Sequence, residues 1–183
     1  MAQFNSFVRI PLLALRQRIR PLPRIDLLAP DALAMRVSPT DIDFNLHMNN
    51  SRYLVRMDYA RIHLVAATGM MGLAVRRRWQ PLIGSVFITY RRSLPLLARF
   101  TLTSRNICWD EKWVYTEQSF TFAEGLAAVA WVKALFRGAD GNVPPQAIVD
   151  ELQPGLVSPP VSDALAQWNE LTRGQLSGSG GGR

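Results

Sequence analysis

The strongest periodic pattern in the chain lies over residues 51–68, where apolar side chains recur at intervals of three and four. This spacing places them along one stripe of an α-helix. The opposite side of the same segment is also largely apolar, so we predict a helix that lies inside the fold. Asn49, Asn50 and Ser51 supply good N-terminal caps for it. The stripe consists of Tyr53, Met57, Ala60, Leu64 and Ala67.

Alternating apolar and polar residues, which are typical of β-strands, occupy most of the remaining chain. Residues 76–78 are expected to form a loop, and short helices are expected over residues 144–152 and 162–172, the second capped by Ser162. One strand is expected before the central helix and four after it, over residues 32–37, 82–90, 100–109, 113–122 and 126–137.

An α+β fold, in which a curved antiparallel sheet wraps around one central helix, satisfies this order of elements. Such a sheet leaves edges with unpaired backbone groups, and we therefore expect a dimer at least. We divide the chain into a basic N-terminal arm (1–31), the main domain (32–153), a C-terminal helical extension (154–176) and a flexible Gly/Ser tail (177–183).

Composition narrows the classes of function. The chain has 183 residues, of which 48% are hydrophobic and 19% charged, as in one globular domain of ordinary size. The single cysteine, Cys108, excludes an intrachain disulfide and a cysteine-based zinc site, and a reducing, cytoplasmic location is expected. The net charge of +7 attracts anions, such as phosphorylated ligands or acidic lipid surfaces. No nucleic-acid motif is recognised, and we expect no nucleic-acid partner.

The N-terminal arm mixes arginines with apolar residues and prolines over residues 7–24. One interpretation is a basic, amphipathic segment in peripheral contact with a membrane. The other, which we prefer, is an arm packed along the domain with its arginines in solvent. The apolar run over residues 10–15 is far shorter than the ~20 residues that span a bilayer. Charges interrupt the apolar stretch, which argues against a cleavable signal peptide.

The segment between the first strand and the central helix carries a motif. It reads Asp43, three residues, His47, one residue, Asn49-Asn50, two residues and Tyr53, followed by Asp58 and Ala60-Arg61. This motif resembles that of the hotdog-fold acyl-CoA thioesterases, in particular the 4-hydroxybenzoyl-CoA thioesterase type and its long-chain acyl-CoA relatives. The resemblance implies the hotdog fold, an acyl-CoA substrate, no cofactor, and a homodimer or homotetramer. Residues 91–94 and 109–110 also resemble a less characterised group of the superfamily, whose animal members are membrane-associated.

The motif contains the groups that thioester hydrolysis needs, a carboxylate near the carbonyl carbon and a donor near the developing oxyanion. Asp43 precedes the helix by about seven residues, so the loop can fold its carboxylate over the helix N-terminus. Unpaired N–H groups and the positive end of the helix dipole favour an oxyanion there. By resemblance, the backbone N–H of Asn50 is the oxyanion donor and Asp43 is the general base or nucleophile. His47 either assists directly or holds the loop through hydrogen bonds.

Substrate contacts are expected from the helix and from the loop after the next strand. Tyr53 and Met57 are expected to contact the acyl chain. Arg91 and Arg92 are expected to hold the phosphates of coenzyme A, because the guanidinium group matches phosphate geometry. The expected lining of the chain tunnel also includes Met48, Met70, Met71 and Phe87.

Each candidate also has a structural interpretation. Asp43 can cap the loop or pair with an arginine, and Asn49 and Asn50 can act as caps alone. Asp41, Asp43 and His47 are metal-ligand types, but the only other histidine, His63, lies far along the helix, so we expect no metal site. His63 is expected to be a packing or capped residue and Cys108 a small core residue, and the arginines can be solvated surface charges.

The sequence therefore predicts a thioesterase that hydrolyses a medium- or long-chain acyl-CoA. The alternative is a non-catalytic hotdog protein, peripheral to a membrane, that binds an acyl thioester or a lipid. Asp43 distinguishes the two, because only the hydrolase needs its carboxylate. A hotdog dehydratase or hydratase is disfavoured, because the setting of His47 does not match the arrangement of that group.

Overall fold

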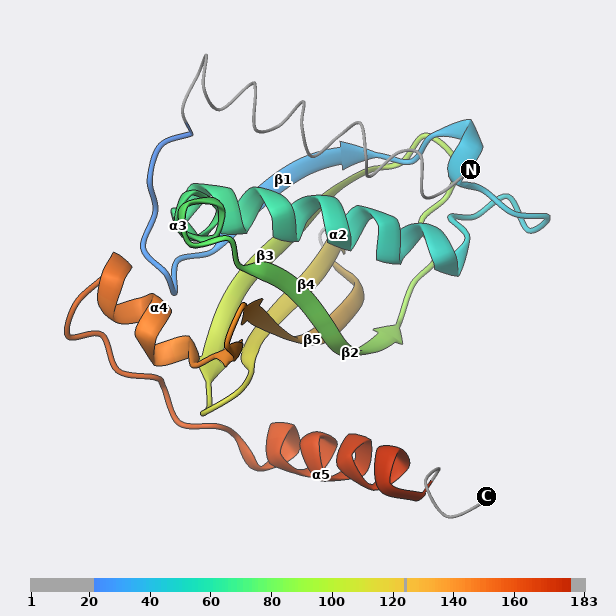
Figure 1. Ribbon diagram of the computed structural model, residues 1–183. Helices are drawn as coiled ribbons and strands as arrows, with labels where there is room; N and C mark the ends of the chain where they lie inside the picture. Colours follow the sequence, from blue (N-terminus) through green and yellow to red (C-terminus); the bar gives the residue numbers. More distant parts are fainter. Residues whose placement is uncertain (1–21, 124, 179–183) are drawn as a thin grey trace.

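The computed structural model describes residues 22–123 and 125–178, and every structural statement below concerns these residues. Its centre is the long helix α2 (Asn50–Ala67), which lies across one face of a curved antiparallel sheet (Figure 1). The helix α5 (Asp163–Gly178) lies on the other side of the sheet. This is the arrangement that the sequence predicts, one central helix and a sheet that wraps around it.

The sheet confirms the five strands predicted from alternation, with ends that differ by one or two residues. In space their order is β1-β3-β4-β5-β2, all neighbours are antiparallel, and β6 pairs with the end of β5. The strand β6 is not among the strands expected from the sequence, and it forms a short hairpin with β5. The strands are β1 (Asp31–Arg36), β2 (Gln80–Tyr90), β3 (Arg99–Trp109), β4 (Val114–Phe122), β5 (Gly125–Gly138) and β6 (Gly141–Val143).

The predicted apolar stripe of α2 is its buried face, and all five of its residues are buried. The first half of the stripe packs against Phe100, Leu102 and Phe120 on the inner face of the sheet. The fully buried Gln118 of β4 also ties the helix to the sheet. Its side-chain nitrogen donates to the Met57 carbonyl at 3.1 Å, and its oxygen accepts from Arg61 at 2.7 Å.

The outer face of the sheet is covered by α5. Trp168 of this helix packs against Tyr115 and Trp131, with ring centroids 6.5 Å apart in both pairs. Lys133 is buried beneath the helix, where its ammonium group donates to Asn169 at 2.8 Å and lies over the Trp168 ring. Both faces of the central strands are therefore covered within one chain.

Phe87, expected to line an acyl-chain tunnel beside the central helix, lies on the other face of the sheet. Its ring packs against Trp131 and Trp168 on the outer face. Alternate residues of a strand point to opposite faces, and its neighbours Val86 and Ile88 take the inward positions. Phe87 therefore belongs to the contact between β2 and α5.

Arg76 and Arg77 of the expected loop are instead part of a helix, α3 (Met70–Arg77), and Arg78 is its C-cap. Met70, Leu73 and Ala74 form its buried face, but eight residues are too few for a helical period to stand out in the sequence. Arg76 and Arg77 occupy its last turn, where positive charge interacts favourably with the helix dipole.

The two C-terminal helices are confirmed. The first is α4 (Pro145–Leu152), and α5 runs further than predicted. Ser162 caps α5, since its hydroxyl accepts from the Leu165 N–H at 3.4 Å.

Residues 22–30 pack onto the domain. The Ile25 N–H donates to the Ala67 carbonyl at 3.1 Å, and Leu27 is buried, with its carbonyl accepting from the Asn106 side chain at 2.9 Å. The predictions about the rest of the N-terminal arm fall on residues 1–21, which lie outside the described residues, as do residues 179–183. In the described part of the chain, no helix is long and apolar enough to cross a bilayer.

Candidate functional site

The loop between β1 and α2, here called the Asp43 loop (residues 42–48), is closed at its base. Ile42 and Met48 form an antiparallel bridge. Inside the loop, the Asp43 N–H donates to the His47 carbonyl, and the Leu46 N–H donates to the Asp43 carbonyl, both at 3.0 Å. These bonds hold Asp43 beside the segment that enters α2.

The carboxylate of Asp43 is half-buried and has one oxygen engaged. Its Oδ1 accepts from the Asn45 N–H at 2.9 Å, which orients the side chain. Within the described residues, Oδ2 has no hydrogen-bond partner and no arginine pairs with Asp43. An oriented carboxylate with one available oxygen can take a proton from water or attack a carbonyl carbon.

The first turn of α2 contains a backbone N–H, that of Asn50, for which the described residues supply no acceptor. Asn49 caps the helix: its side-chain oxygen accepts from the Ser51 N–H at 2.9 Å and its carbonyl from the Arg52 N–H at 2.8 Å. The N–H of Asn50 has no acceptor among the described residues. A free N–H at the positive end of a helix is suited to a developing oxyanion. It is the N–H that the resemblance indicates, and its role stays a prediction.

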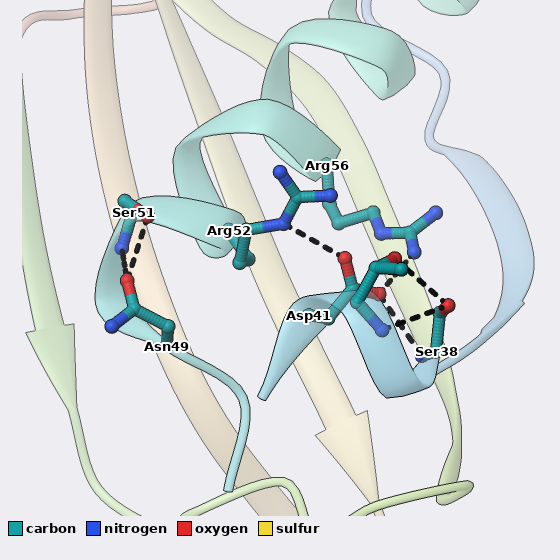
Figure 2. A network of polar contacts seen from close by, with 7 residues as sticks. Ser38, Asp41, Asn49, Ser51, Arg52 and Arg56 are labelled. Atoms are coloured by element: carbon teal, nitrogen blue, oxygen red, sulfur yellow. Dashed lines mark hydrogen bonds and ion pairs between the residues drawn. The ribbon is translucent and has the colours of Figure 1, made fainter. Parts of the chain in front are cut away.

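Asp41 anchors the Asp43 loop to the helix (Figure 2). Its buried carboxylate accepts from the Ser38 N–H at 3.0 Å and the Arg52 Nε at 2.9 Å, and it also pairs with Arg56. Its carbonyl accepts from the Asn49 N–H at 2.8 Å. Burial alone would raise the pKa of Asp41, but the bonds from Ser38, Arg56 and Arg52 outweigh it and hold the pKa below its usual value.

Sequence reasoning missed this role of Asp41. The signal was a capping box, since Asp41 follows Ser38 by three residues and the two cap the 3-10 helix η1 (Pro39–Asp41) reciprocally. Arg52 and Arg56 lie one turn apart on α2, so both reach the same carboxylate. This pairing joins η1, the Asp43 loop and the start of α2 into one unit.

His47 holds the loop through its backbone. It forms an antiparallel bridge with Pro95, and its side chain makes no hydrogen bond to another described residue. A direct role of its imidazole in the chemistry stays a prediction. His63 lies elsewhere on α2 and contacts Asp31, with Nδ1 and Oδ2 2.6 Å apart. Among the described residues, no group of three or more His, Cys, Asp or Glu could hold a metal ion.

Tyr90, at the end of β2, is a contact that sequence reasoning missed. Its hydroxyl donates to the Asn50 carbonyl at 3.4 Å, and its ring meets the Tyr53 ring edge-on, with centroids 5.0 Å apart. Burial raises the pKa of Tyr90 above its ordinary value, which keeps the hydroxyl a donor. The end of β2 is therefore fixed against the N-terminus of α2.

The predicted acyl-chain residues lie in the core. Tyr53 is 2% exposed and packs against Phe120 with ring centroids 4.9 Å apart, and Met57 is fully buried. Contact of Tyr53 and Met57 with an acyl chain stays a prediction. Cys108 is a buried core residue, as predicted, and burial followed by the charge of Asp110 raises the pKa of its thiol to about 11.

The predicted phosphate-binding arginines lie at the surface. The N–H groups of Arg91 and Arg92 both donate to the Ala127 carbonyl, at 2.8 and 3.0 Å, which anchors their backbone. Their side chains are exposed, and neither pairs with a carboxylate among the described residues. Phosphate binding by this pair also stays a prediction.

Comparison with known proteins agrees with this architecture. A family model described as "Thioesterase-like superfamily" matches residues 37–168. Protein THEM6 of Xenopus laevis is 32% identical over 180 residues, which cover 96% of this chain and 85% of the relative. A probable thioesterase of Saccharomyces cerevisiae is 28% identical over 113 residues, which cover 60% of this chain and 49% of the relative.

Solved structures show the same fold. A probable thioesterase of Escherichia coli aligns with a TM-score of 0.62 at 19% identity, covering 69% of this chain and 98% of its own. A Staphylococcus aureus protein in complex with CoA aligns with a TM-score of 0.61 at 15% identity, and the alignment covers 78% of this chain and 95% of that protein. The curled sheet and the central helix are those of the hotdog fold that these neighbours share. The chain belongs to the thioesterase-like superfamily.

Proposed function

We propose that this protein is an acyl-CoA thioesterase that hydrolyses medium- or long-chain acyl-CoA. One observation carries the proposal: the start of α2 combines an oriented carboxylate with an available oxygen, Asp43, and a backbone N–H without an acceptor among the described residues, Asn50. A thioester hydrolase needs these two groups. Membership of the thioesterase-like superfamily supports this class of reaction.

In the general-base route, Asp43 takes a proton from a water molecule as the water oxygen attacks the thioester carbonyl carbon. The carbonyl oxygen becomes an oxyanion that accepts a hydrogen bond from the Asn50 N–H. The tetrahedral intermediate then collapses and the C–S bond breaks. The coenzyme A thiolate leaves with the bonding electrons and takes up a proton, and Asp43 returns to its carboxylate form.

In the nucleophilic route, an Asp43 oxygen attacks the carbonyl carbon itself. The C–S bond breaks, the thiolate leaves, and a mixed anhydride between Asp43 and the acyl group remains. Water then hydrolyses the anhydride, which releases the fatty acid, restores the Asp43 carboxylate and supplies the proton that the thiolate takes up. Both routes use Asp43 and the Asn50 N–H, and His47 is proposed to orient the loop or the water in either.

The substrate contacts follow from position. Arg91 and Arg92 are proposed to hold the phosphates of coenzyme A, since their exposed guanidinium groups pair with no carboxylate among the described residues. Tyr53 and Met57 are proposed to contact the acyl chain. Because both side chains are buried, such a contact requires the acyl chain to enter between α2 and the sheet.

We also propose a homodimer that forms along β2. This strand lies at one end of the sheet order and exposes Leu82, Ile83 and Tyr90. An apolar strand with an unpaired edge is a template for pairing with a second copy. Since Tyr90 contacts Asn50, a partner on β2 would border the site. We place the protein in the cytoplasm, where its single thiol would stay reduced.

Thiol release from purified protein tests the proposed function. Acyl-CoAs from short to long chains are supplied and free coenzyme A is measured. The proposal expects release that is highest for medium or long chains. If no acyl-CoA releases thiol but a non-hydrolysable analogue binds, the protein is instead a binder of acyl thioesters. A preference for short or aromatic acyl groups would refute the proposed substrate class.

A further inference from the structure

Large apolar side chains project into solvent at one end of the molecule, beside the proposed site. Phe44 and Leu46 in the Asp43 loop are 105% and 65% exposed, and Leu96 and Leu97 in the connection between β2 and β3 are also exposed. The two segments are joined, because the Leu96 N–H donates to the Leu46 carbonyl at 3.3 Å. Both lie on the right of Figure 1. We call these four residues the apolar tip.

Two leucines of the apolar tip also have an unfavourable backbone conformation. Leu46 and Leu97 have φ angles of 59° and 63°, in the left-handed region that glycine adopts more easily than leucine. The chain thus carries a large apolar side chain where a smaller residue suits the backbone better. A cluster of exposed apolar residues marks an interaction surface.

Arginines lie directly behind the apolar tip. Arg36 and Arg99 face each other across β1 and β3, and the Arg36 Nε donates to the Leu97 carbonyl at 2.9 Å. Both line a hollow of about 580 Å³ on the outer face of the sheet. Neither pairs with a carboxylate in the part of the chain that the structure describes. Like charges that face each other across two strands repel, and an anion between them relieves the repulsion.

Arg91 and Arg92 are exposed as well, and they precede Leu96 and Leu97 on the connection between β2 and β3. The guanidinium group of Arg92 lies against the start of β5, where a Cβ on Gly125 would come within 2.4 Å of it. The surface therefore combines apolar side chains with four cations that have no carboxylate partner among the described residues. This combination matches the interface of an anionic bilayer.

We propose that this end of the molecule docks on an anionic lipid bilayer, with the apolar tip in the interface and the arginines on the lipid phosphates. The proposal rests on the proposed function only for the substrate, which would be a long-chain acyl-CoA held in the bilayer and presented to Asp43, next to Phe44. A second copy fits this surface less well, because a two-fold contact here would bring the same four arginines face to face.

Vesicle binding by the full chain, without substrate, tests the docking surface. Phosphatidylcholine vesicles with and without phosphatidylserine are sedimented with the protein at low and high salt. We expect binding to the anionic vesicles that weakens at high salt. Phe44→Ser/Leu46→Ser should lower the partition coefficient about 10–100-fold. Arg36→Gln/Arg99→Gln should lower it about 10–30-fold for anionic vesicles only.

Matched control variants lie away from this end. Val75→Ser/Leu171→Ser removes two exposed apolar groups, 70% and 69% exposed, from α3 and α5. Arg76→Gln/Arg78→Gln removes two exposed arginines at the end of α3. Both controls should bind as the wild type does, and circular dichroism checks that each variant is folded. Wild-type protein that does not bind, or binding unchanged in Phe44→Ser/Leu46→Ser, would overturn the proposal. If Phe44→Ser/Leu46→Ser becomes a monomer in light scattering while its vesicle binding is unchanged, the apolar tip is a contact between two copies, and the proposal is overturned. None of these outcomes depends on thioester hydrolysis.

Discussion

Replacing Asp41 with asparagine removes the charge that ties the Asp43 loop to helix α2. The carboxylate is fully buried, while the side chains of Arg52 and Arg56 are 29% and 23% exposed. Asparagine keeps the shape, but its NH2 group is a donor and cannot accept from a guanidinium. The variant therefore leaves two arginines facing a neutral side chain.

The expected cost follows from this geometry. Removing one partner of a buried ion pair costs about 3–5 kcal/mol. Because the arginines are partly exposed and can be rehydrated, we expect the lower end, about 3 kcal/mol. For a chain of this size that corresponds to a fall in Tm of about 6–12 °C. Activity should also fall, because the Asn49 N–H bonds the Asp41 carbonyl and the loop moves with that residue.

The effect of Asp41→Asn should depend on pH. Burial alone would raise the pKa of Asp41, but the Ser38 N–H and the two guanidinium groups hold it below the ordinary value of 3.8. A carboxylate whose pKa is lowered by folding stabilises the protein above its unfolded pKa, and that contribution is lost as the pH falls through the folded value. The stability difference between wild type and variant should thus be full at pH 7 and should shrink below about pH 4.

Denaturant unfolding at pH 7 and pH 3 measures this difference. The matched control is Asp58→Asn, which changes the same residue type beside an arginine on the same helix, but at a side chain that is 61% exposed. An exposed pair is worth about 0.2–1 kcal/mol, so the control should change stability little. If Asp41→Asn costs no more than Asp58→Asn, or if its cost does not change with pH, Asp41 does not anchor the loop.

Three further outcomes follow. Gln118→Met keeps the size of a fully buried side chain but loses its hydrogen bonds to Met57, Ser104 and Arg61. It should lower the free energy of unfolding by about 2–4 kcal/mol in denaturant unfolding. The exposed Gln167→Met should change that free energy very little. The Cys108 thiol, with its pKa raised to about 11, should resist a thiol reagent at pH 8 until the protein unfolds, and immediate labelling would contradict its burial. Ile83→Asp places a charge on the apolar edge of β2 and should produce a monomer in light scattering. Val75→Asp on α3 should leave the dimer intact. A dimer that persists in Ile83→Asp would show that the contact between the copies lies elsewhere.

The fold could be predicted from the sequence wherever the apolar period is long. The stripe of α2 and the four long strands each repeat their period several times, so the pattern alone defines them. The helix α3 and the strand β6 could not be predicted, because eight and three residues carry too few repeats. The prediction for Phe87 is wrong because it rests on the apolar character of the side chain alone. The alternation of side chains along β2 puts Phe87 on the face opposite to that of Val86 and Ile88.

The site could be predicted only in its local part. The motif around Asp43, the cap at Asn49 and the N–H of Asn50 lie within a few residues of each other, so their proximity follows from the chain itself. Tyr90 could not be found in this way, because it reaches Asn50 across 40 residues. The pairing of Asp41 with Arg52 and Arg56 has a local signal in the capping box, but its burial depends on how the loop folds against the helix.

Thiol release by Asp43→Asn tests the central claim most directly. The amide keeps the size of the side chain and can still accept from the Asn45 N–H, so the loop should hold. It cannot take a proton from water or attack the thioester, so turnover should fall by ~10²–10⁴, or roughly 3–5 kcal/mol of transition-state stabilisation. Binding of a non-hydrolysable acyl-CoA and the Tm should be kept.

Asp140→Asn is the matched control, because Asp140 is exposed in the turn before β6. Asp41 cannot serve as a control, because its buried carboxylate anchors the Asp43 loop. The account predicts that Asp140→Asn releases thiol at the wild-type rate while Asp43→Asn binds the analogue but releases almost none. Near wild-type turnover by Asp43→Asn, or an equal loss of turnover in both variants, would contradict the assignment of Asp43 as the carboxylate that acts on the thioester.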